Sequence, residues 1–238
     1  MIEIKNISHK YKKQHHNILN DINFYISDGE FVTIVGKSGC GKSTLLNIIA
    51  GYIKPTDGQM VIDGKEVNKP GKDRIVIHQG YDHFDWMSVK DNLNLINKDE
   101  LVVNQLLSKV GLNDKHESFP YELSGGMKKR LSIARALAVN PKFLIMDEPF
   151  SSLDHKIRSQ IYKEVSILTK ELNKTVLLVT HDLDEAIELS NKIIVLSGNP
   201  TTVHEVIYLD RHNQSNDHSK VLDQIFNLKN QIKKLIED

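Results

Sequence analysis

Residues 36–44 read Gly36-Lys37-Ser38-Gly39-Cys40-Gly41-Lys42-Ser43-Thr44. This stretch matches G-x-x-x-x-G-K-[ST], the pattern of a phosphate-binding loop, in which glycines let backbone amides turn toward phosphate oxygens. An apolar, β-branched run at 31–35 precedes it, which predicts a strand buried on both faces. Helical spacing follows over 42–50 and ends at Gly51, a residue suited to a helix C-cap. This order of strand, loop and helix predicts a nucleotide-binding α/β fold.

All nine residues of this phosphate loop are predicted to line the nucleotide site. Lys42 is expected to reach the β- and γ-phosphates as a cation, and the Ser43 hydroxyl to ligate Mg²⁺. The helix that begins near Lys42 adds the positive end of its dipole. Cys40 occupies a free position of the motif, and we interpret it as a small residue whose amide matters. The alternative is a redox switch, but the chain has no second cysteine to resolve an oxidised form.

Composition sets the class of protein. The 238 residues are 39% hydrophobic and 26% charged, which is ordinary globular usage and argues against a disordered chain. Lys and Arg number 31 and Asp and Glu 31, so no overall field favours nucleic acid, and no nucleic-acid partner is expected. The single cysteine excludes an internal disulfide and fits a reducing compartment. No apolar stretch approaches the roughly 20 residues of a spanning helix, so membrane contact is expected to go through a partner.

Strand and helix patterns alternate along the rest of the chain, and a helical stretch interrupts them in the middle. Strands are predicted at 2–7, 18–26, 31–35, 60–62, 74–78, 143–146, 175–180, 193–196 and 203–209. Helices are predicted at 42–50, 89–96, 99–110, 127–139, 156–172, 183–190 and 219–236, with a polar linker at 211–217. This layout predicts a mostly parallel sheet with helices and one helical insertion.

Two carboxylates, Asp147 and Glu148, end the second buried strand run. Neighbouring strand positions point to opposite faces, so the two acids are expected to do different work. Asp147 is predicted to serve Mg²⁺ at the phosphate loop, and Glu148 to orient or deprotonate the water that attacks the γ-phosphate. The alternative is an acidic turn that only faces solvent.

The segment Leu123-Ser124-Gly125-Gly126-Met127 resembles the LSGGQ signature of ABC transporter ATP-binding subunits, with Met127 in place of the usual Gln. Ser124, Gly125 and Gly126 leave amides free at a helix N-terminus, which makes a second anion site. The resemblance implies that this signature segment binds the γ-phosphate of an ATP held by a second copy of the chain. ATP would then hold a head-to-tail dimer together.

Further segments resemble the same family in the family's order. Gln79, after the strand at 74–78, resembles the Q-loop glutamine that touches Mg²⁺ and the attacking water. Residues 151–154 resemble the D-loop, which implies a place for Asp154 at the nucleotide. His181 resembles the switch histidine that contacts the γ-phosphate, and Tyr11 is placed like the aromatic residue that stacks on adenine.

The resemblance covers essentially the whole chain and implies a fold. That fold is an α/β P-loop NTPase (RecA-like) core with a mostly parallel sheet, an antiparallel β subdomain and an inserted α-helical subdomain. The implied organisation is a single ABC ATPase domain over 1–238, with the core at about 1–83 and 141–238 and the helical subdomain at about 84–140. ATP and Mg²⁺ are the implied ligands.

Trp86, the only tryptophan, lies seven residues after Gln79. A Trp at this offset resembles importers of nitrate, sulfonate, taurine and related solutes, although Asp85 stands where those often have Pro. The alternative is a residue that packs the helical insertion. The region is expected to form the groove for the cytoplasmic helix of a permease.

The function implied is that of an ATP-hydrolysing subunit that energises a membrane importer of a small organic solute or anion. The expected partners are a second copy of the chain, permease subunits and an extracytoplasmic solute-binding protein, at the cytoplasmic face of the cell membrane. The alternatives are an exporter or lipoprotein-release system, and a soluble ABC ATPase of DNA repair or translation. The transported solute never touches this subunit, so the sequence does not name it.

Overall fold

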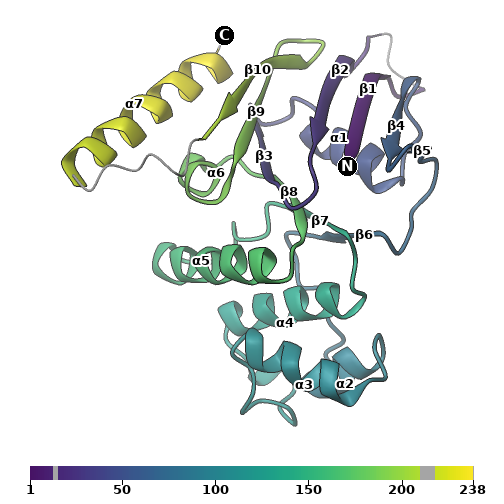
Figure 1. Ribbon diagram of the computed structural model, residues 1–238, viewed down its shortest axis with the longest axis vertical. Helices are drawn as coiled ribbons and strands as arrows, with labels where there is room; N and C mark the ends of the chain where they lie inside the picture. Colours follow the sequence, from purple (N-terminus) through teal and green to yellow (C-terminus); the bar gives the residue numbers. More distant parts are fainter. Residues whose placement is uncertain (13–15, 210–217, 238) are drawn as a thin grey trace. The chain divides into compact units, whose positions relative to one another are not determined.

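The computed structural model describes residues 1–12, 16–209 and 218–237, so the predicted linker at 211–217 lies outside the described residues. The chain divides into two compact units (Figure 1): unit one joins Met1–Pro70 to Thr175–Asp238, and unit two is Gly71–Lys174. The predicted helical subdomain, 84–140, falls within unit two together with two strands. The predicted subdomain boundaries and the single-domain organisation stay predictions.

Unit one contains an antiparallel sheet in the order β2-β1-β4-β5. Its strands are β1 (Ile2–His9), β2 (Leu19–Ile26), β4 (Asp57–Ile62) and β5 (Lys65–Glu66). Ile2, Ile4 and Ile7 of β1 are buried, and the pairing of β1 with β2 shifts register on either side of Ile7. The predicted antiparallel subdomain is therefore confirmed. The strand β5 was not predicted, because its two charged residues carry no apolar signal.

Four strands of the second sheet belong to unit one, in the order β10-β9-β3-β8. They are β3 (Phe31–Gly36), β8 (Thr175–Val179), β9 (Lys192–Ser197) and β10 (Thr202–Tyr208). The strand β3 runs parallel to both β8 and β9, and β10 is antiparallel to β9. Every residue of β3 is buried, as its continuous apolar run predicts. The helices of this unit are α1 (Lys42–Ala50), α6 (Leu183–Leu189) and α7 (His218–Glu237).

Unit two pairs β6 (Arg74–Ile77) in parallel with β7 (Phe143–Asp147). Its helices are α2 (Val89–Asn94), α3 (Glu100–Lys109), α4 (Gly125–Ala138) and α5 (His155–Glu171), with a 3-10 turn at Pro120–Glu122 that was not predicted. Helix α4 packs against α2, α3, α5 and β6, so it forms the centre of this unit. The parallel strands of both units confirm the mostly parallel sheet of the predicted P-loop NTPase fold.

Helix α7 covers one face of β9 in unit one. Ile232 is fully buried there in a cluster with Ile193 and Val195, and Lys229 forms an ion pair with Asp184. The opposite side of α7 faces solvent, with Phe226 63% exposed. Among the helices in the described ranges, none is both long and apolar enough to cross a membrane.

Ile232→Ala should lower the free energy of unfolding by about 2–4 kcal/mol, because it removes a buried side chain and leaves a cavity beside β9. Phe226→Ala, on the exposed side of the same helix, is the matched control and should change stability by less than about 0.5 kcal/mol. Denaturant titration of the two variants measures both values. Equal losses in the two variants would contradict the observed packing of α7.

Candidate functional site

The phosphate loop joins β3 to α1 in unit one, and its backbone leaves the start of α1 open. Gly41 is the N-cap of α1 with φ 95°, and no side chain caps the first turn of the helix. A side chain at Gly41 would be strained at this φ and would meet Ile18 Cγ2 at 2.7 Å. A Cβ at Gly36 would lie 2.7 Å from the carbonyl oxygen of Leu196. These glycines let the loop lie tightly on its neighbours, and the first amides of α1 remain open to an anion.

The Lys42 ammonium group is enclosed by the backbone of the phosphate loop. Its Nζ donates to the carbonyl oxygens of Gly36 at 2.9 Å and Lys37 at 2.7 Å, and the residue is buried. Ser43, one position further along, is exposed. A buried cation therefore lies next to an exposed hydroxyl and open amide groups, an arrangement suited to a polyphosphate with a bound cation.

His181 lies at the same sheet edge as the phosphate loop. Strands β3 and β8 are parallel, so both end at one edge, and Thr180 N donates to the carbonyl oxygen of Ile34 at 3.3 Å. Thr180 Oγ1 fixes the turn, because it accepts from Asp182 N at 3.0 Å and donates to Glu185 Oε2 at 2.7 Å. The imidazole is exposed at this edge. Within unit one the structure thus brings His181 and the phosphate loop together.

Tyr11 is tied to the first turn of α1. Its hydroxyl lies 3.2 Å from Thr44 Oγ1, and its ring packs edge-to-face on His9 at 5.0 Å between centroids. The Tyr11 side chain keeps 40% of its surface exposed. A half-exposed aromatic ring beside the phosphate loop is able to stack on a flat heterocycle.

Unit two brings three predicted residues to one edge of its strand pair. Ile77 of β6 lies opposite Met146 of β7, so Gln79 and the acids Asp147 and Glu148 follow strands that end together. The alternation predicted for the two acids is wrong, because Glu148 lies outside the strand with φ 44°. Its carbonyl oxygen accepts from the hydroxyl of Ser151 at 2.9 Å, which holds this left-handed turn. Backbone strain of this kind gathers at functional sites.

The signature segment forms the start of α4. Ser124 is the N-cap, and its Oγ accepts from Met127 N at 3.3 Å, so the helix begins at Gly125 and not at the predicted Met127. Ser124 and Gly125 are exposed, whereas Gly126 is buried, and a Cβ there would meet Ile157 Cγ2 at 2.9 Å. Asp154 of the D-loop caps α5 through a hydrogen bond accepted from Ile157 N at 3.0 Å.

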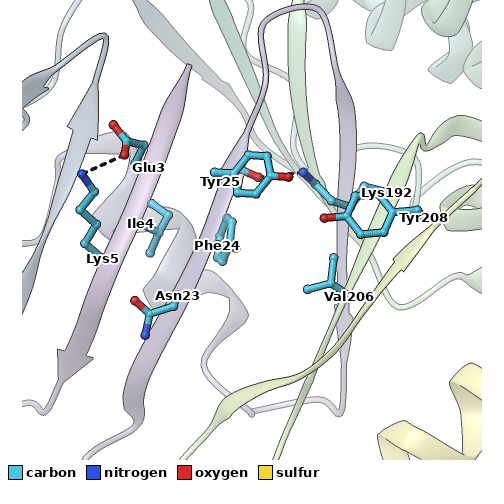
Figure 2. Close-up of a pocket in the computed structure, with 9 residues that line it drawn as sticks. All are labelled: Glu3, Ile4, Lys5, Asn23, Phe24, Tyr25, Lys192, Val206 and Tyr208. Atoms are coloured by element: carbon cyan, nitrogen blue, oxygen red, sulfur yellow. Dashed lines mark hydrogen bonds and ion pairs between the residues drawn. The ribbon is translucent and has the colours of Figure 1, made fainter.

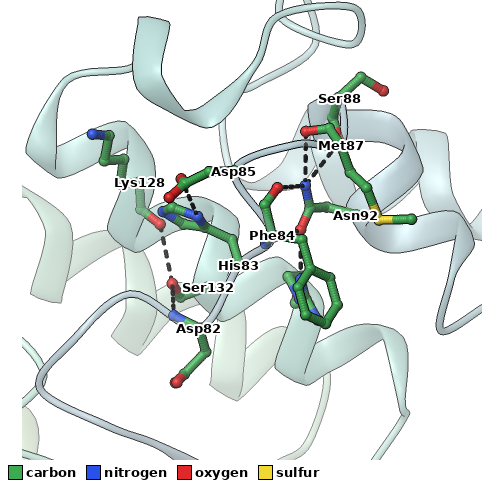
Figure 3. A network of polar contacts seen from close by, with 10 residues as sticks. Asp82, His83, Phe84, Asp85, Met87, Ser88, Asn92, Lys128 and Ser132 are labelled. Atoms are coloured by element: carbon green, nitrogen blue, oxygen red, sulfur yellow. Dashed lines mark hydrogen bonds and ion pairs between the residues drawn. The ribbon is translucent and has the colours of Figure 1, made fainter.

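Figure 3 shows the polar contacts that Asn92 makes with the loop at 84–88. Asn92 is fully buried, accepts from Phe84 N at 2.8 Å, and donates to the carbonyl oxygens of Phe84, Met87 and Ser88. This one amide fixes the loop at 84–88. Trp86 lies against the Phe84 ring at 4.9 Å between centroids but is 74% exposed. The loop therefore presents the indole to solvent and does not bury it in the helical packing.

A model of the ABC transporter family matches residues 19–151, more than half of the chain. This protein belongs to the ABC transporter family. It is 40% identical over 200 residues to the nitrate import ATP-binding protein NrtD of Synechococcus elongatus, covering 79% of this chain and 73% of that one. It is 41% identical over 213 residues to the aliphatic sulfonates import ATP-binding protein SsuB of Bacillus cereus, covering 87% and 85%.

Solved ABC structures have the same fold. The dimeric structure of MJ0796, a bacterial ABC transporter cassette, superposes with a TM-score of 0.74 at 32% identity, covering 88% of this chain and 99% of that one. The predicted family and fold class are therefore confirmed.

Two residues of this ABC protein that support the site were missed in the sequence. Thr201 Oγ1 donates to the carbonyl oxygen of Cys40 at 2.5 Å, while Thr201 N donates to that of Ile18, so the turn after β9 braces the phosphate loop. Lys129 of α4 is fully buried, and this burial lowers its pKa to about 8 against the opposing pull of Asp82. The burial of Lys129 could have been inferred from helical spacing, because Lys129 lies four residues before the buried Ile133 and thus on the same face of the helix.

The ABC protein also has a pocket of about 380 Å³ in unit one, and none of the predicted site residues lines it. Figure 2 shows Lys192 there between Tyr25 and Tyr208. The Lys192 ammonium is buried, donates to the Tyr25 carbonyl oxygen at 2.8 Å and to Glu30 at 2.9 Å, and lies 4.3 Å from the Tyr25 ring centroid. Lys5, the other lysine that lines this pocket, pairs with Glu3 at 2.8 Å, so both cations are already paired with groups of the protein.

The environment of His83, four residues after Gln79, predicts that the stability of the protein depends on pH. Burial lowers its pKa, Asp85 opposes the shift, and Lys128 and Arg135 add to it. The unfolded chain therefore takes up a proton near pH 6.5 before the folded protein does, so stability falls as the pH drops below about 6.5. His83→Phe, which keeps a ring to stack on Tyr81, should remove part of this loss. Unfolding free energies at pH 8 and 5.5 test this, and identical pH dependence in both proteins would contradict it.

Proposed function

We propose that this chain is the ATP-binding and ATP-hydrolysing subunit of an ABC importer for a small organic solute or anion. The observation that carries the ATP part is the uncapped N-terminus of α1 at the phosphate loop. The Lys42 ammonium lies in the same loop, where it donates to the carbonyl oxygen of Gly36. The importer part is supported by the similarity to nitrate and sulfonate import subunits. An exporter or lipoprotein-release ATPase is the alternative.

The phosphate loop binds the polyphosphate of ATP through its backbone amides. When ATP binds, the Lys42 ammonium leaves the carbonyl oxygens of the loop and pairs with the β- and γ-phosphates. The Tyr11 ring stacks on adenine. Ser43, Gln79 and Asp147 offer only oxygen donors, which fit Mg²⁺, a hard cation that prefers oxygen. When bound, Mg²⁺ neutralises charge on the β- and γ-phosphates.

Hydrolysis is assigned to Glu148, Gln79 and His181. Glu148 accepts the proton of the attacking water, and the turn held by Ser151 fixes the backbone of this base. The Gln79 amide orients the same water, while His181 contacts the γ-phosphate oxygens. The proposal keeps the predicted organisation, a single ABC ATPase domain over 1–238 with a core at about 1–83 and 141–238 and a helical subdomain at about 84–140.

A second copy of the chain completes each ATP site in this proposal. Ser124, Gly125 and Gly126 lie at the start of a 14-residue helix and bind the γ-phosphate of the ATP held by the partner, with Asp154 near the interface. The similarity to a dimeric ABC cassette supports this head-to-tail arrangement.

The remaining proposed partners are permease subunits at the cytoplasmic face of the cell membrane and an extracytoplasmic solute-binding protein. Exposure of the Trp86 indole on a loop fixed by Asn92 supports a contact with a permease helix. Co-purification with the permease, followed by ATPase assays in vesicles loaded with the solute-binding protein and nitrate or a sulfonate, tests the importer assignment. ATP hydrolysis that does not depend on the loaded solute and binding protein would favour the exporter alternative.

Glu148→Gln should lower ATP hydrolysis by about 10²-fold or more, because it removes the base while Lys42 and the loop amides still bind ATP. The ATP-bound variant should run as a dimer in size-exclusion chromatography and as a monomer without nucleotide. Adding Lys42→Ala should abolish the dimer. Glu171→Gln, an exposed carboxylate of unit two, is the matched control and should hydrolyse ATP at the parental rate. Parental turnover in Glu148→Gln would disprove the assignment of the base.

Trp86→Ala should weaken the complex with the permease by about 2 kcal/mol, roughly thirty-fold in affinity, as is usual for a central aromatic anchor. Basal ATPase activity of the isolated subunit should be unchanged. Tyr208→Ala removes another exposed aromatic ring, from unit one, and should leave the complex intact. Affinity measurement with detergent-solubilised permease compares the two variants. Loss of basal turnover with an intact complex would contradict the docking role.

A further inference from the structure

Lys129 makes an unusual set of contacts in unit two. Its side chain is fully buried, and its Nζ donates to three successive carbonyl oxygens, those of His78 at 3.0 Å, Gln79 at 3.1 Å and Gly80 at 2.9 Å. An ammonium group has three protons, so this loop takes its whole donor capacity. Because burying a charge is costly unless it is well paired, the three bonds make this one loop conformation strongly preferred.

The same loop is fastened to α4 at two further points. Asp82 N donates to Ser132 Oγ at 3.1 Å, and Ser132 Oγ donates to the carbonyl oxygen of Lys128, as Figure 3 shows. Tyr81 lies at the start of the helix, where a Cβ on Gly125 would be 3.1 Å from its hydroxyl. The Lys129 ammonium lies 5.5 Å from the centroid of the Tyr81 ring. The segment 78–82 is thus attached along the first two turns of α4.

We propose that Lys129 is a positioning residue that fixes the loop carrying Gln79 to the helix carrying the signature segment, and so couples the two ATP sites of the dimer through one chain. This inference rests on the proposed function, in which Gln79 serves the ATP of its own chain and Ser124 to Gly126 serve the ATP of the partner. Lys129 joins these two groups within one rigid set of contacts. Binding of ATP at one site therefore biases the position of the water-orienting glutamine at the other.

The physical basis is the stiffness of the connection. Three hydrogen bonds to a charged donor are each stronger than a neutral bond, and they hold consecutive peptide groups. A shift of the N-terminus of α4 on binding a γ-phosphate is transmitted to Gln79 through them. Without them, Tyr81 and Ser132 remain as attachments, but the peptide groups of residues 78–80 lose their donor and the loop is free to adopt other conformations.

Lys129→Met tests the proposal in the full-length protein. The nucleotide Kd should stay within about twofold, because the phosphate loop is untouched. The kcat should fall about tenfold or more, since a misplaced water-orienting group is costly. The Hill coefficient for ATP should fall from a parental value above 1 to about 1. Trp86, the only tryptophan, reports on this segment, so the change in its emission on ATP binding should be lost.

Lys128→Met is the matched control, because Lys128 is the adjacent residue of α4 and its ammonium lies over the Tyr81 ring at 5.9 Å. It should keep the parental kcat and Hill coefficient. If Lys129→Met does not fold, Lys129→Gln takes its place and should show the same changes in smaller measure. A folded Lys129 variant with parental kcat, Hill coefficient and emission response would overturn the proposal, as would a parental Hill coefficient of 1. A parent that neither binds nor hydrolyses ATP would instead overturn the proposed function.

Discussion

The open N-terminus of α1 is the feature on which the rest of the site depends. It exists because Gly36 and Gly41 let the phosphate loop lie against Leu196 and Ile18, where a Cβ would collide, and because no side chain caps the helix. Amide groups that a cap would otherwise satisfy are left for a ligand with negative charge. The buried charge of Lys42 adds to the same attraction for an anion.

Within each unit, the fold brings the ends of parallel strands to one edge. In unit one this edge holds the phosphate loop and His181, and in unit two it holds Gln79, Asp147 and Glu148. In the proposed function, unit one binds the phosphates through this loop, and unit two supplies the acids and an amide. The left-handed backbone of Glu148 carries a conformational cost, and the hydrogen bond from Ser151 offsets part of it.

Buried polar groups give unit two its defined shape. Asn92 fixes the loop that exposes Trp86, and Lys129 fixes the loop that carries Gln79, in both cases by bonding successive backbone groups. Such groups are costly to bury when unsatisfied, so they favour one loop conformation over many. Apolar contacts alone would hold α4 against α5 but would not set the register of these loops, because apolar contact has little directional preference.

The sequence alone determined the family and the fold class and predicted the phosphate-binding residues, because these depend on local patterns: glycine spacing, apolar runs and the order of motifs. Only the tertiary structure decided that Glu148 leaves the strand, that Asp154 caps α5, and that Thr201 braces Cys40. It also showed that Lys129, which in the sequence belongs to an ordinary basic run, is fully buried and donates hydrogen bonds to backbone carbonyl oxygens. Such roles arise from contacts between residues far apart in the chain, whose partners no local pattern specifies.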